Sequence, residues 1–212
     1  MPTLVKICGI TRVEDAQLAA ELGAFALGFN FYPRSPRSIA PRAARSLIER
    51  LPPLLTVGVY ADETDAELVL DVAQEAGVHI LQLHGPRFPE LDALLPTYPV
   101  IQAVAVGEDF KPELLASLRT KNYLLDAFHP DLKGGTGKTF DWSLARQATK
   151  YGTIILAGGL NPENVGRAIA EIRPFAVDVA SGVESSPGIK SPALLRAFFA
   201  AVEQANQYFS GS

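Results

Sequence analysis

The sequence of 212 residues predicts an α/β protein folded as a (β/α)8 or TIM barrel, with residues 1–212 in a single domain. Two observations carry this prediction. Short apolar runs rich in Val, Ile, Leu and Phe recur along the whole chain, and segments with helical spacing separate them. Such continuous runs are typical of parallel strands that are covered on both faces. No linker or composition break divides the chain, and an open doubly wound sheet is the alternative fold.

Eight apolar runs are the expected strands of the barrel. They cover residues 4–8, 26–31, 55–60, 80–85, 100–106, 122–128, 153–159 and 176–182. The expected helices cover residues 12–24, 41–51, 64–76, 88–95, 111–119, 141–150, 162–172 and 192–208. Residues that commonly cap helices precede several of them, namely Thr11, Asp62 or Thr64, Asn161 and Ser191. In such a barrel, catalytic groups lie at the carboxyl ends of strands and in the loops that follow.

The composition describes a chain that can bury a sizeable core, with 48% hydrophobic and 20% charged residues. Nineteen basic and 23 acidic residues give a formal net charge of -4 without a basic cluster, which argues against nucleic acid as a partner. The amino terminus lacks the basic start and apolar core of a signal peptide, and no run approaches about 18 apolar residues. We therefore expect a cytoplasmic protein that does not bind membranes.

Paired small residues follow the seventh and eighth expected strands, in "LAGGL" (156–160) and "VASGVE" (179–184). Gly158, Gly159 and Gly182 leave backbone N–H groups open, and these two loops often form a phosphate site in barrels, aided by a short extra helix. We expect a phosphate site here, with "GVESSPG" (182–188) supplying part of the turn. The alternative is that the glycines only allow the chain to turn tightly.

The segment "KGGTGKTF" (133–140) has a superficial likeness to a nucleotide-binding loop. The Walker pattern requires a glycine five residues before Gly137, and that position is Leu132. We therefore expect residues 134–137 to form a flexible glycine-rich loop over the mouth of the barrel rather than a nucleotide site.

Two strand ends carry groups suited to acid–base chemistry. Asp126 closes the sixth apolar run, where a carboxyl group is partly removed from water and suited to act as a general acid, or else caps a neighbouring loop. Cys8 is the only cysteine, which excludes an internal disulfide and a Cys-rich zinc site. It ends the first expected strand and so faces the catalytic end, although a free cysteine is often only a small buried hydrophobe.

Three further charged residues are candidates for binding a substrate. Arg37 and Arg34 lie in the loop after the second strand, where a guanidinium group either holds an anionic group of the substrate or stays solvated. Asp178, inside the eighth expected strand, either accepts hydrogen bonds from substrate hydroxyls or from the backbone.

The three histidines do not indicate a metal site. His84 ends the fourth expected strand, and an interior imidazole with hydrogen-bond partners explains it at least as well as a function does. His79 and His129 are scattered, and no group of His, Asp and Glu residues has the spacing of metal ligands. We expect no metal.

Seven segments in order along the chain resemble the phosphoribosylanthranilate isomerase family. They are "KICGIT", "GFNFYPRSPRSI", "QLHG", "LLDAF", "GGTGKTFDW", "LAGGLNPENV" and "FAVDVASGVESSPGIK". The resemblance spans the whole chain and implies a (β/α)8 barrel. It also implies an enzyme of tryptophan biosynthesis that converts N-(5-phosphoribosyl)anthranilate to the carboxyphenylamino-deoxyribulose phosphate by an Amadori rearrangement, without metal or cofactor.

The resemblance also implies roles for individual residues. Cys8 would be the general base and Asp126 the general acid. Arg37 would hold the anthranilate carboxylate, and Asp178 would contact the sugar hydroxyls. The phosphate would bind to the backbone at Gly158, Gly159, Ser181 and Gly182. A cysteine base must be a thiolate, and Lys6 is one candidate for stabilising it, provided that regular strand alternation places both side chains on one face.

Two other functions fit parts of the sequence. A phosphate-binding lyase or synthase of the barrel class would be expected to use a strand-end lysine, whereas the groups at the strand ends here are a thiol and a carboxyl group. A regulator that binds phosphosugars without catalysis would not need both a base and an acid. The partner expected is a small phosphosugar substrate, and the protein is expected to be a monomer or a homodimer.

Overall fold

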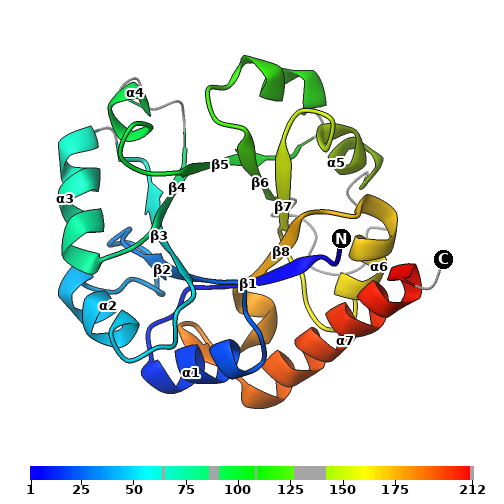
Figure 1. Ribbon diagram of the computed structural model, residues 1–212, viewed down its shortest axis with the longest axis horizontal. Helices are drawn as coiled ribbons and strands as arrows, with labels where there is room; N and C mark the ends of the chain where they lie inside the picture. The colour runs from blue at the N-terminus through cyan, green and yellow to red at the C-terminus, as the bar shows by residue number, and fades with distance from the viewer. Residues whose placement is uncertain (64, 86–90, 108, 127–141, 211–212) are drawn as a thin grey trace.

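The structure is a computed structural model that describes residues 1–63, 65–85, 91–107, 109–126 and 142–210. Eight parallel strands pair in chain order, and the first also pairs with the last, which closes the sheet into a barrel (Figure 1). They are β1 (Leu4–Cys8), β2 (Ala26–Asn30), β3 (Leu55–Ala61), β4 (Ile80–His84), β5 (Val100–Ala105), β6 (Asn122–Asp126), β7 (Thr153–Ala157) and β8 (Ala176–Val179). The closed sheet confirms the predicted barrel, and the open doubly wound alternative is wrong.

Helices form the outer ring of the barrel (Figure 1). They are α1 (Val13–Glu21), α2 (Pro41–Ile48), α3 (Ala66–Ala76), α4 (Leu91–Leu94), α5 (Trp142–Ala148), α6 (Val165–Ile172) and α7 (Pro192–Ser210). The expected helix at 111–119 is instead the six-residue 3-10 helix η1 (Pro112–Ser117), in which the N–H of Leu114 bonds the carbonyl of Lys111. Within the described ranges, no helix combines the length and the apolar character that a membrane crossing requires.

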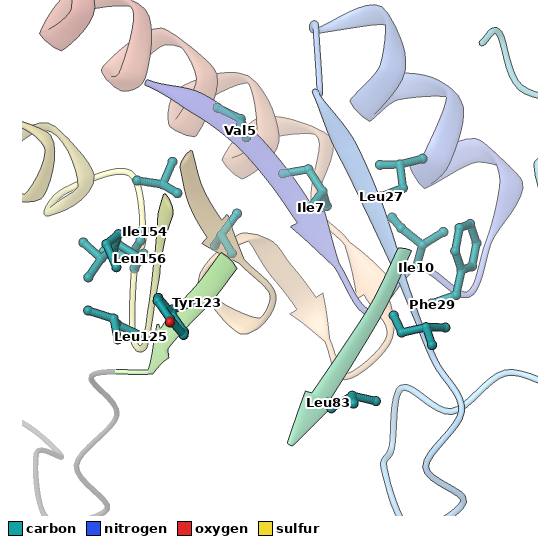
Figure 2. Packing of buried hydrophobic residues seen from close by; sticks show 14 of the residues in the cluster. Val5, Ile7, Ile10, Leu27, Phe29, Leu83, Tyr123, Leu125, Ile154 and Leu156 are labelled. Atoms are coloured by element: carbon teal, nitrogen blue, oxygen red, sulfur yellow. The ribbon is translucent and has the colours of Figure 1, made fainter. Parts of the chain in front are cut away.

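Side chains alternate along each strand between two apolar layers. One set, which includes Val5, Ile7, Leu27 and Phe29, belongs to the large cluster that packs against the helices (Figure 2). The other set fills the barrel itself and consists of Ala26, Val57, Ile101, Leu124, Ile155, Ala157 and Ala176. Because alternation assigns every second residue to the interior, the last inward position of each strand lies at the mouth of the barrel.

The seventh and eighth expected strands extend too far. β7 stops at Ala157 because Gly158 and Gly159 have φ angles of 93° and 65°, in the left-handed region that a strand does not use. β8 stops at Val179 and is followed by a short 3-10 turn, η2 (Ser181–Val183). Of the segment 182–188, the first two residues belong to η2, and the rest leads into a hairpin with strands β9 (Glu184–Ser186) and β10 (Ile189–Lys190).

The expected helix caps are only partly correct. Ser191 caps α7, because its hydroxyl accepts the N–H of Leu194. Asn161 accepts the N–H groups of Glu163 and Asn164 in a turn before α6, which begins at Val165 after the N-cap residue Asn164. Helix α3 is capped by Asp65 rather than by Asp62, and Thr64 lies outside the described residues. Thr11 does not cap α1, because its hydroxyl donates to the carbonyl of Gly188 in the hairpin.

Candidate active site

A cavity of about 240 Å³ opens at the carboxyl ends of the strands. Its lining includes Cys8 from β1, Asp126 from β6, Asp178 from β8 and Arg37 from the loop after β2. Gly158, Gly159 and Ser181 line another part of the same cavity. The fold therefore brings together most of the residues that the sequence singled out for chemistry or binding, the exceptions being Gly182 and Arg34.

Lys6 and Cys8 point to the same side of β1. A Cβ added to Gly28, on the neighbouring strand β2, would lie 2.8 Å from Cys8 Sγ and 3.1 Å from Lys6 Nζ. The register is regular here, since Lys6 faces Ala26 and Cys8 faces Gly28. Lys6 Nζ also lies 2.8 Å from Asp178 Oδ1 across the junction of β1 and β8. Regular strand alternation therefore places Lys6 and Cys8 on one face, as Lys6 must lie to stabilise a thiolate at Cys8.

The proton of Cys8 is subject to opposing influences. Burial raises the pKa of the thiol above its ordinary value, and the charge of Asp178 raises it further. The positive charges of Lys6 and Lys190 work in the opposite direction but do not outweigh burial. Without substrate, the thiol form of Cys8 is therefore favoured, and Lys6 limits the cost of forming the thiolate.

Asp126 shares the mouth of the barrel with a pair of polar residues from β4. The Nε2 atoms of Gln82 and His84 lie 2.8 Å apart, and both side chains line the cavity. Burial lowers the pKa of His84, although the charge of Asp126 opposes this shift. His84 is thus a partly buried imidazole, with Gln82 as a hydrogen-bond partner, within the candidate site. Among the described residues, Gln82 Oε1 is buried without a hydrogen-bond partner.

Arg37 reaches the cavity, whereas its neighbour Arg34 does not line it. The Nε and Nη2 atoms of Arg37 bond the carboxylate of Glu184 at 2.9 and 2.6 Å. The stem of the side chain crosses Gly9, where an added Cβ would lie 2.6 Å from Arg37 Cδ. The Arg37 side chain remains 23% exposed, so its guanidinium group is accessible from the cavity.

The loops after β7 and β8 offer open backbone donors. None of the hydrogen bonds among the described residues uses the backbone N–H groups of Gly159, Ser181 or Gly182. Gly182 has a packing role as well, because an added Cβ would lie 1.8 Å from the carbonyl oxygen of Leu160. Its close approach joins the two loops, and its place in a phosphate site stays a prediction.

No group of three or more His, Cys, Asp and Glu residues in the described part of the chain is arranged to hold a metal ion. His79 lies at the other end of β4, where its Nδ1 is 2.8 Å from the hydroxyl of Thr56. His129, the segment 133–140 and the expected glycine-rich loop at 134–137 lie outside the described residues.

Comparison with known proteins identifies the family. The family model of N-(5'-phosphoribosyl)anthranilate (PRA) isomerase matches residues 5–201. The chain belongs to the phosphoribosylanthranilate isomerase family. The N-(5'-phosphoribosyl)anthranilate isomerase of Syntrophus aciditrophicus is 46% identical over 203 residues, which cover 95% of this chain and 88% of that protein.

Solved structures of phosphoribosylanthranilate isomerases share the fold over nearly the whole chain. The enzyme from Thermus thermophilus has a TM-score of 0.85 and 44% identity, covering 95% of this chain and 99% of that chain. A second isomerase was crystallised in complex with reduced 1-(o-carboxyphenylamino)-1-deoxyribulose 5-phosphate, with a TM-score of 0.84, 39% identity and coverage of 95% and 99%.

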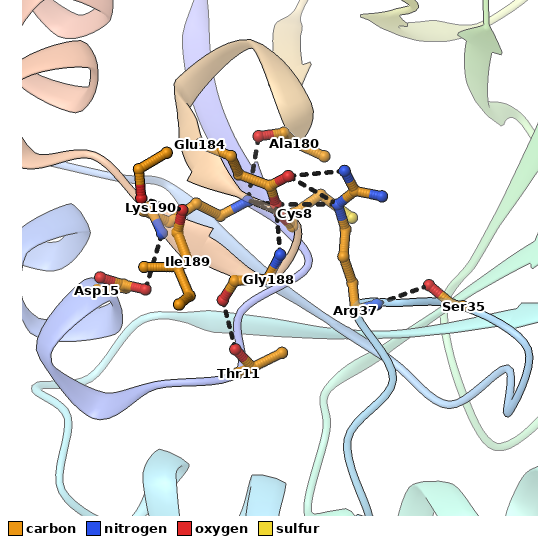
Figure 3. Close-up of polar contacts among 11 residues, drawn as sticks. Cys8, Thr11, Asp15, Ser35, Arg37, Ala180, Glu184, Gly188, Ile189 and Lys190 are labelled. Atoms are coloured by element: carbon orange, nitrogen blue, oxygen red, sulfur yellow. Dashed lines mark hydrogen bonds and ion pairs between the residues drawn. The ribbon is translucent and has the colours of Figure 1, made fainter.

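Two charged residues next to the site, Glu184 and Lys190, are not predicted from the sequence of this family member. Both lie on the hairpin beside Arg37 (Figure 3), and their side chains are almost fully buried. Glu184 pairs with Arg37 across 147 positions of sequence, and no local pattern predicts such a pairing. A glutamate and a lysine within one short hairpin are the only sequence signal, and a solvated turn has the same appearance.

Proposed function

We propose that this chain catalyses the Amadori rearrangement of N-(5-phospho-β-D-ribosyl)anthranilate to 1-(2-carboxyphenylamino)-1-deoxy-D-ribulose 5-phosphate, a step of tryptophan biosynthesis. The observation that carries the proposal is that a thiol and a carboxyl group, Cys8 and Asp126, line one cavity at the mouth of the barrel. Membership of the isomerase family supports this substrate. The reaction moves protons within one molecule and needs no redox cofactor, so the chain's own acid and base suffice.

In the proposed mechanism, Asp126 protonates the ring oxygen of the ribose, and the ring opens to a Schiff base. Cys8, as a thiolate, then removes the proton from C2 to give an enolamine, which tautomerises to the ketone. The raised pKa of the Cys8 thiol makes the thiolate a strong base once formed. Lys6 supports it, because its ammonium group lies against both Cys8 and Asp178.

The remaining residues of the cavity are proposed to bind the substrate. Arg37 holds the anthranilate carboxylate through its planar guanidinium group. Asp178 accepts hydrogen bonds from the sugar hydroxyls. The backbone at Gly158, Gly159, Ser181 and Gly182 holds the phosphate, and the open N–H groups in these two loops support that assignment.

The test is a fluorescence assay of phosphoribosylanthranilate consumption by the purified protein and its Cys8→Ala and Asp126→Asn variants. Each variant is expected to lose at least about 100-fold in kcat, because it lacks a positioned acid or base. Both are expected to bind reduced 1-(o-carboxyphenylamino)-1-deoxyribulose 5-phosphate, which serves as the control for folding. Full activity in both variants would contradict these roles, and no turnover by the unaltered protein would favour a binding module.

The proposal extends to the setting in which the enzyme works. A cytoplasmic location fits a biosynthetic isomerase with a free thiol in its site. The protein is proposed to be a monomer or a homodimer. Sedimentation equilibrium distinguishes the two.

A further inference from the structure

The hairpin after β8 packs against helix α1 and against the loop that follows β1. The backbone N–H of Lys190 donates to Asp15 Oδ2 at 3.0 Å, and Thr11 donates to the carbonyl of Gly188. Figure 3 shows the two charged side chains of the hairpin, Glu184 and Lys190, directed at the guanidinium group of Arg37 and the end of β1. The hairpin thus places one acidic and one basic side chain, those of Glu184 and Lys190, at the edge of the cavity.

Glu184 engages one edge of the Arg37 guanidinium group. Its carboxylate accepts from Arg37 Nε at 2.9 and 3.1 Å and from Nη2 at 2.6 Å. This edge-on pairing leaves the other edge, formed by Nη1 and Nη2, for a second carboxylate. Among the described residues, no acceptor bonds Nη1. Glu184 therefore holds the Nε and Nη2 edge of the Arg37 guanidinium group, while the edge formed by Nη1 and Nη2 remains open to a ligand.

Lys190 in turn holds the carboxylate of Glu184 in place. Its Nζ donates to Glu184 Oε1 at 2.9 Å, to the carbonyl of Cys8 at 2.6 Å and to that of Ala180 at 3.2 Å. Three acceptors require the three N–H donors of the charged ammonium form. Burial opposes ionisation of Glu184, but the hydrogen bonds from Arg37 and Lys190 hold its pKa below the ordinary value. Burial lowers the pKa of Lys190, although the hydrogen bond to Glu184 and the charge of Glu184 oppose this shift, and the three acceptors around Nζ favour the charged form.

The charges of this cluster sum to one positive charge. Arg37 and Lys190 each contribute +1 and Glu184 contributes -1, so the cluster keeps a net charge of +1 beside the cavity. An Arg37–Glu184 pair alone would be neutral and would present a carboxylate to an anionic ligand. Lys190 offsets that carboxylate, and Arg37 keeps its charge for the substrate.

We propose that Glu184 is a positioning residue, which fixes the orientation of Arg37 so that the site selects substrates bearing a carboxylate, with Lys190 as its counter-charge. The inference rests on the proposed function, because it takes Arg37 as the group that binds the anthranilate carboxylate. It goes further in assigning the discrimination between carboxylated and uncarboxylated ligands to the hairpin as well as to Arg37.

The experiment compares two ligands that differ only in the carboxylate. One is reduced 1-(o-carboxyphenylamino)-1-deoxyribulose 5-phosphate, and the other is the same compound with an unsubstituted phenyl ring. Calorimetry gives the discrimination ratio, defined as the Kd of the uncarboxylated compound divided by that of the carboxylated one. In the Glu184→Gln variant the ratio is expected to fall about 10-fold, because an Arg37 without its anchor contributes one charge-assisted hydrogen bond fewer.

The sign of the change separates positioning from simple electrostatics. Glu184→Gln raises the net charge of the cluster from +1 to +2, so a purely electrostatic role for Glu184 predicts tighter binding of the carboxylated ligand and a higher ratio. A purely structural role predicts equal weakening of both ligands, with the ratio unchanged. Either of these outcomes overturns the proposal.

Two further variants complete the design. Arg37→Ala is expected to bring the ratio close to 1, and adding Glu184→Gln to it is expected to change nothing further. A ratio that survives Arg37→Ala would refute the proposed role of Arg37. A ratio that collapses in Arg37→Ala but persists in Glu184→Gln would refute the positioning role alone. Glu171→Gln is the matched control, because Glu171 pairs with Arg167 at 2.9 Å on the surface of α6, away from the cavity.

Discussion

At the scale of single residues, Gly9 explains how the thiol and Arg37 share one small region. Its φ angle of 73° lies in the left-handed region, which turns the chain immediately after Cys8. The absence of a side chain there also makes room for the stem of Arg37. Gly9 therefore ends the strand that carries the proposed base, and it leaves space for the side chain of Arg37, which is proposed to bind the substrate carboxylate.

The pH dependence of Cys8 reactivity follows from its environment. Because burial raises the pKa of the thiol, the thiolate fraction is small at neutral pH and grows as the pH rises. The rate of alkylation by iodoacetamide is therefore expected to rise with pH to a midpoint above the ordinary cysteine value of about 8.5. In Lys6→Met the midpoint is expected to move higher still, because a charge that favours the thiolate is lost.

Intact-mass measurement is sufficient to follow this reaction, since Cys8 is the only cysteine of the chain. Glutathione alkylated under the same conditions supplies the exposed reference thiol. A midpoint below that of glutathione would show that burial does not govern the proton of Cys8. A lower midpoint in Lys6→Met would show that the charge of Lys6 does not favour the thiolate.

At the scale of elements, the contact between the loops after β7 and β8 depends on Gly182. Any side chain at that position would collide with the carbonyl oxygen of Leu160, which belongs to the backbone and cannot swing away. Gly182→Ala is therefore expected to cost about 2 kcal/mol or more in the free energy of unfolding, as overpacking typically does.

Urea unfolding followed by circular dichroism measures this cost. Gly107→Ala is the matched control, because an added Cβ there meets no atom within 4 Å and the residue lies outside the cavity. Equal stability of the two variants would mean that the loops separate easily and that their close contact does not contribute to the fold.

The strand starts could be predicted from the sequence, whereas several strand ends could not. Apolar runs identify buried strands because burial on both faces excludes charges, and all eight runs begin at the residues where the strands begin. The runs at 153–159 and 176–182 continued over small residues that are equally compatible with a turn. Only their backbone angles and the close packing of the two loops decide where the strands stop.

The candidate site was predictable to the same extent. Position at a strand end, together with the family resemblance, placed Cys8 and Asp126 in one cavity. The anchor formed by Glu184 and Lys190 was not predictable, because its partners are the side chain of Arg37 and the carbonyl group of Cys8, far away in sequence. The sequence of the hairpin that carries it does not distinguish a hairpin from a phosphate turn, since serine, proline and glycine suit both.

At the scale of the whole molecule, a buried ion pair lies where the barrel closes. Lys6 on β1 and Asp178 on β8 are paired at 2.8 Å, with side chains 1% and 9% exposed. Lys6→Met leaves the Asp178 carboxylate buried beside an apolar group, so the free energy of unfolding is expected to fall by about 3–5 kcal/mol. The double variant Lys6→Met/Asp178→Leu is expected to recover most of the loss, because neither charge is then buried alone.

Urea titrations of the two variants and the unaltered protein measure these differences. Replacing Glu171, which pairs with Arg167 on the exposed face of α6, is expected to leave the unfolding midpoint nearly unchanged. If Lys6→Met proves as stable as that surface variant, the ion pair contributes nothing to closing the barrel.

The long sequence separations within the site set a time at which the protein can begin to work. Lys6 and Asp178 are 172 positions apart, and Lys190 bonds the carbonyl of a residue 182 positions before it. Ribosomes build chains from the amino end, so Cys8 leaves the exit tunnel long before Asp178 and Lys190 do. A nascent chain that stops before these residues therefore carries the thiol without its pocket, and turnover begins only after the hairpin has emerged.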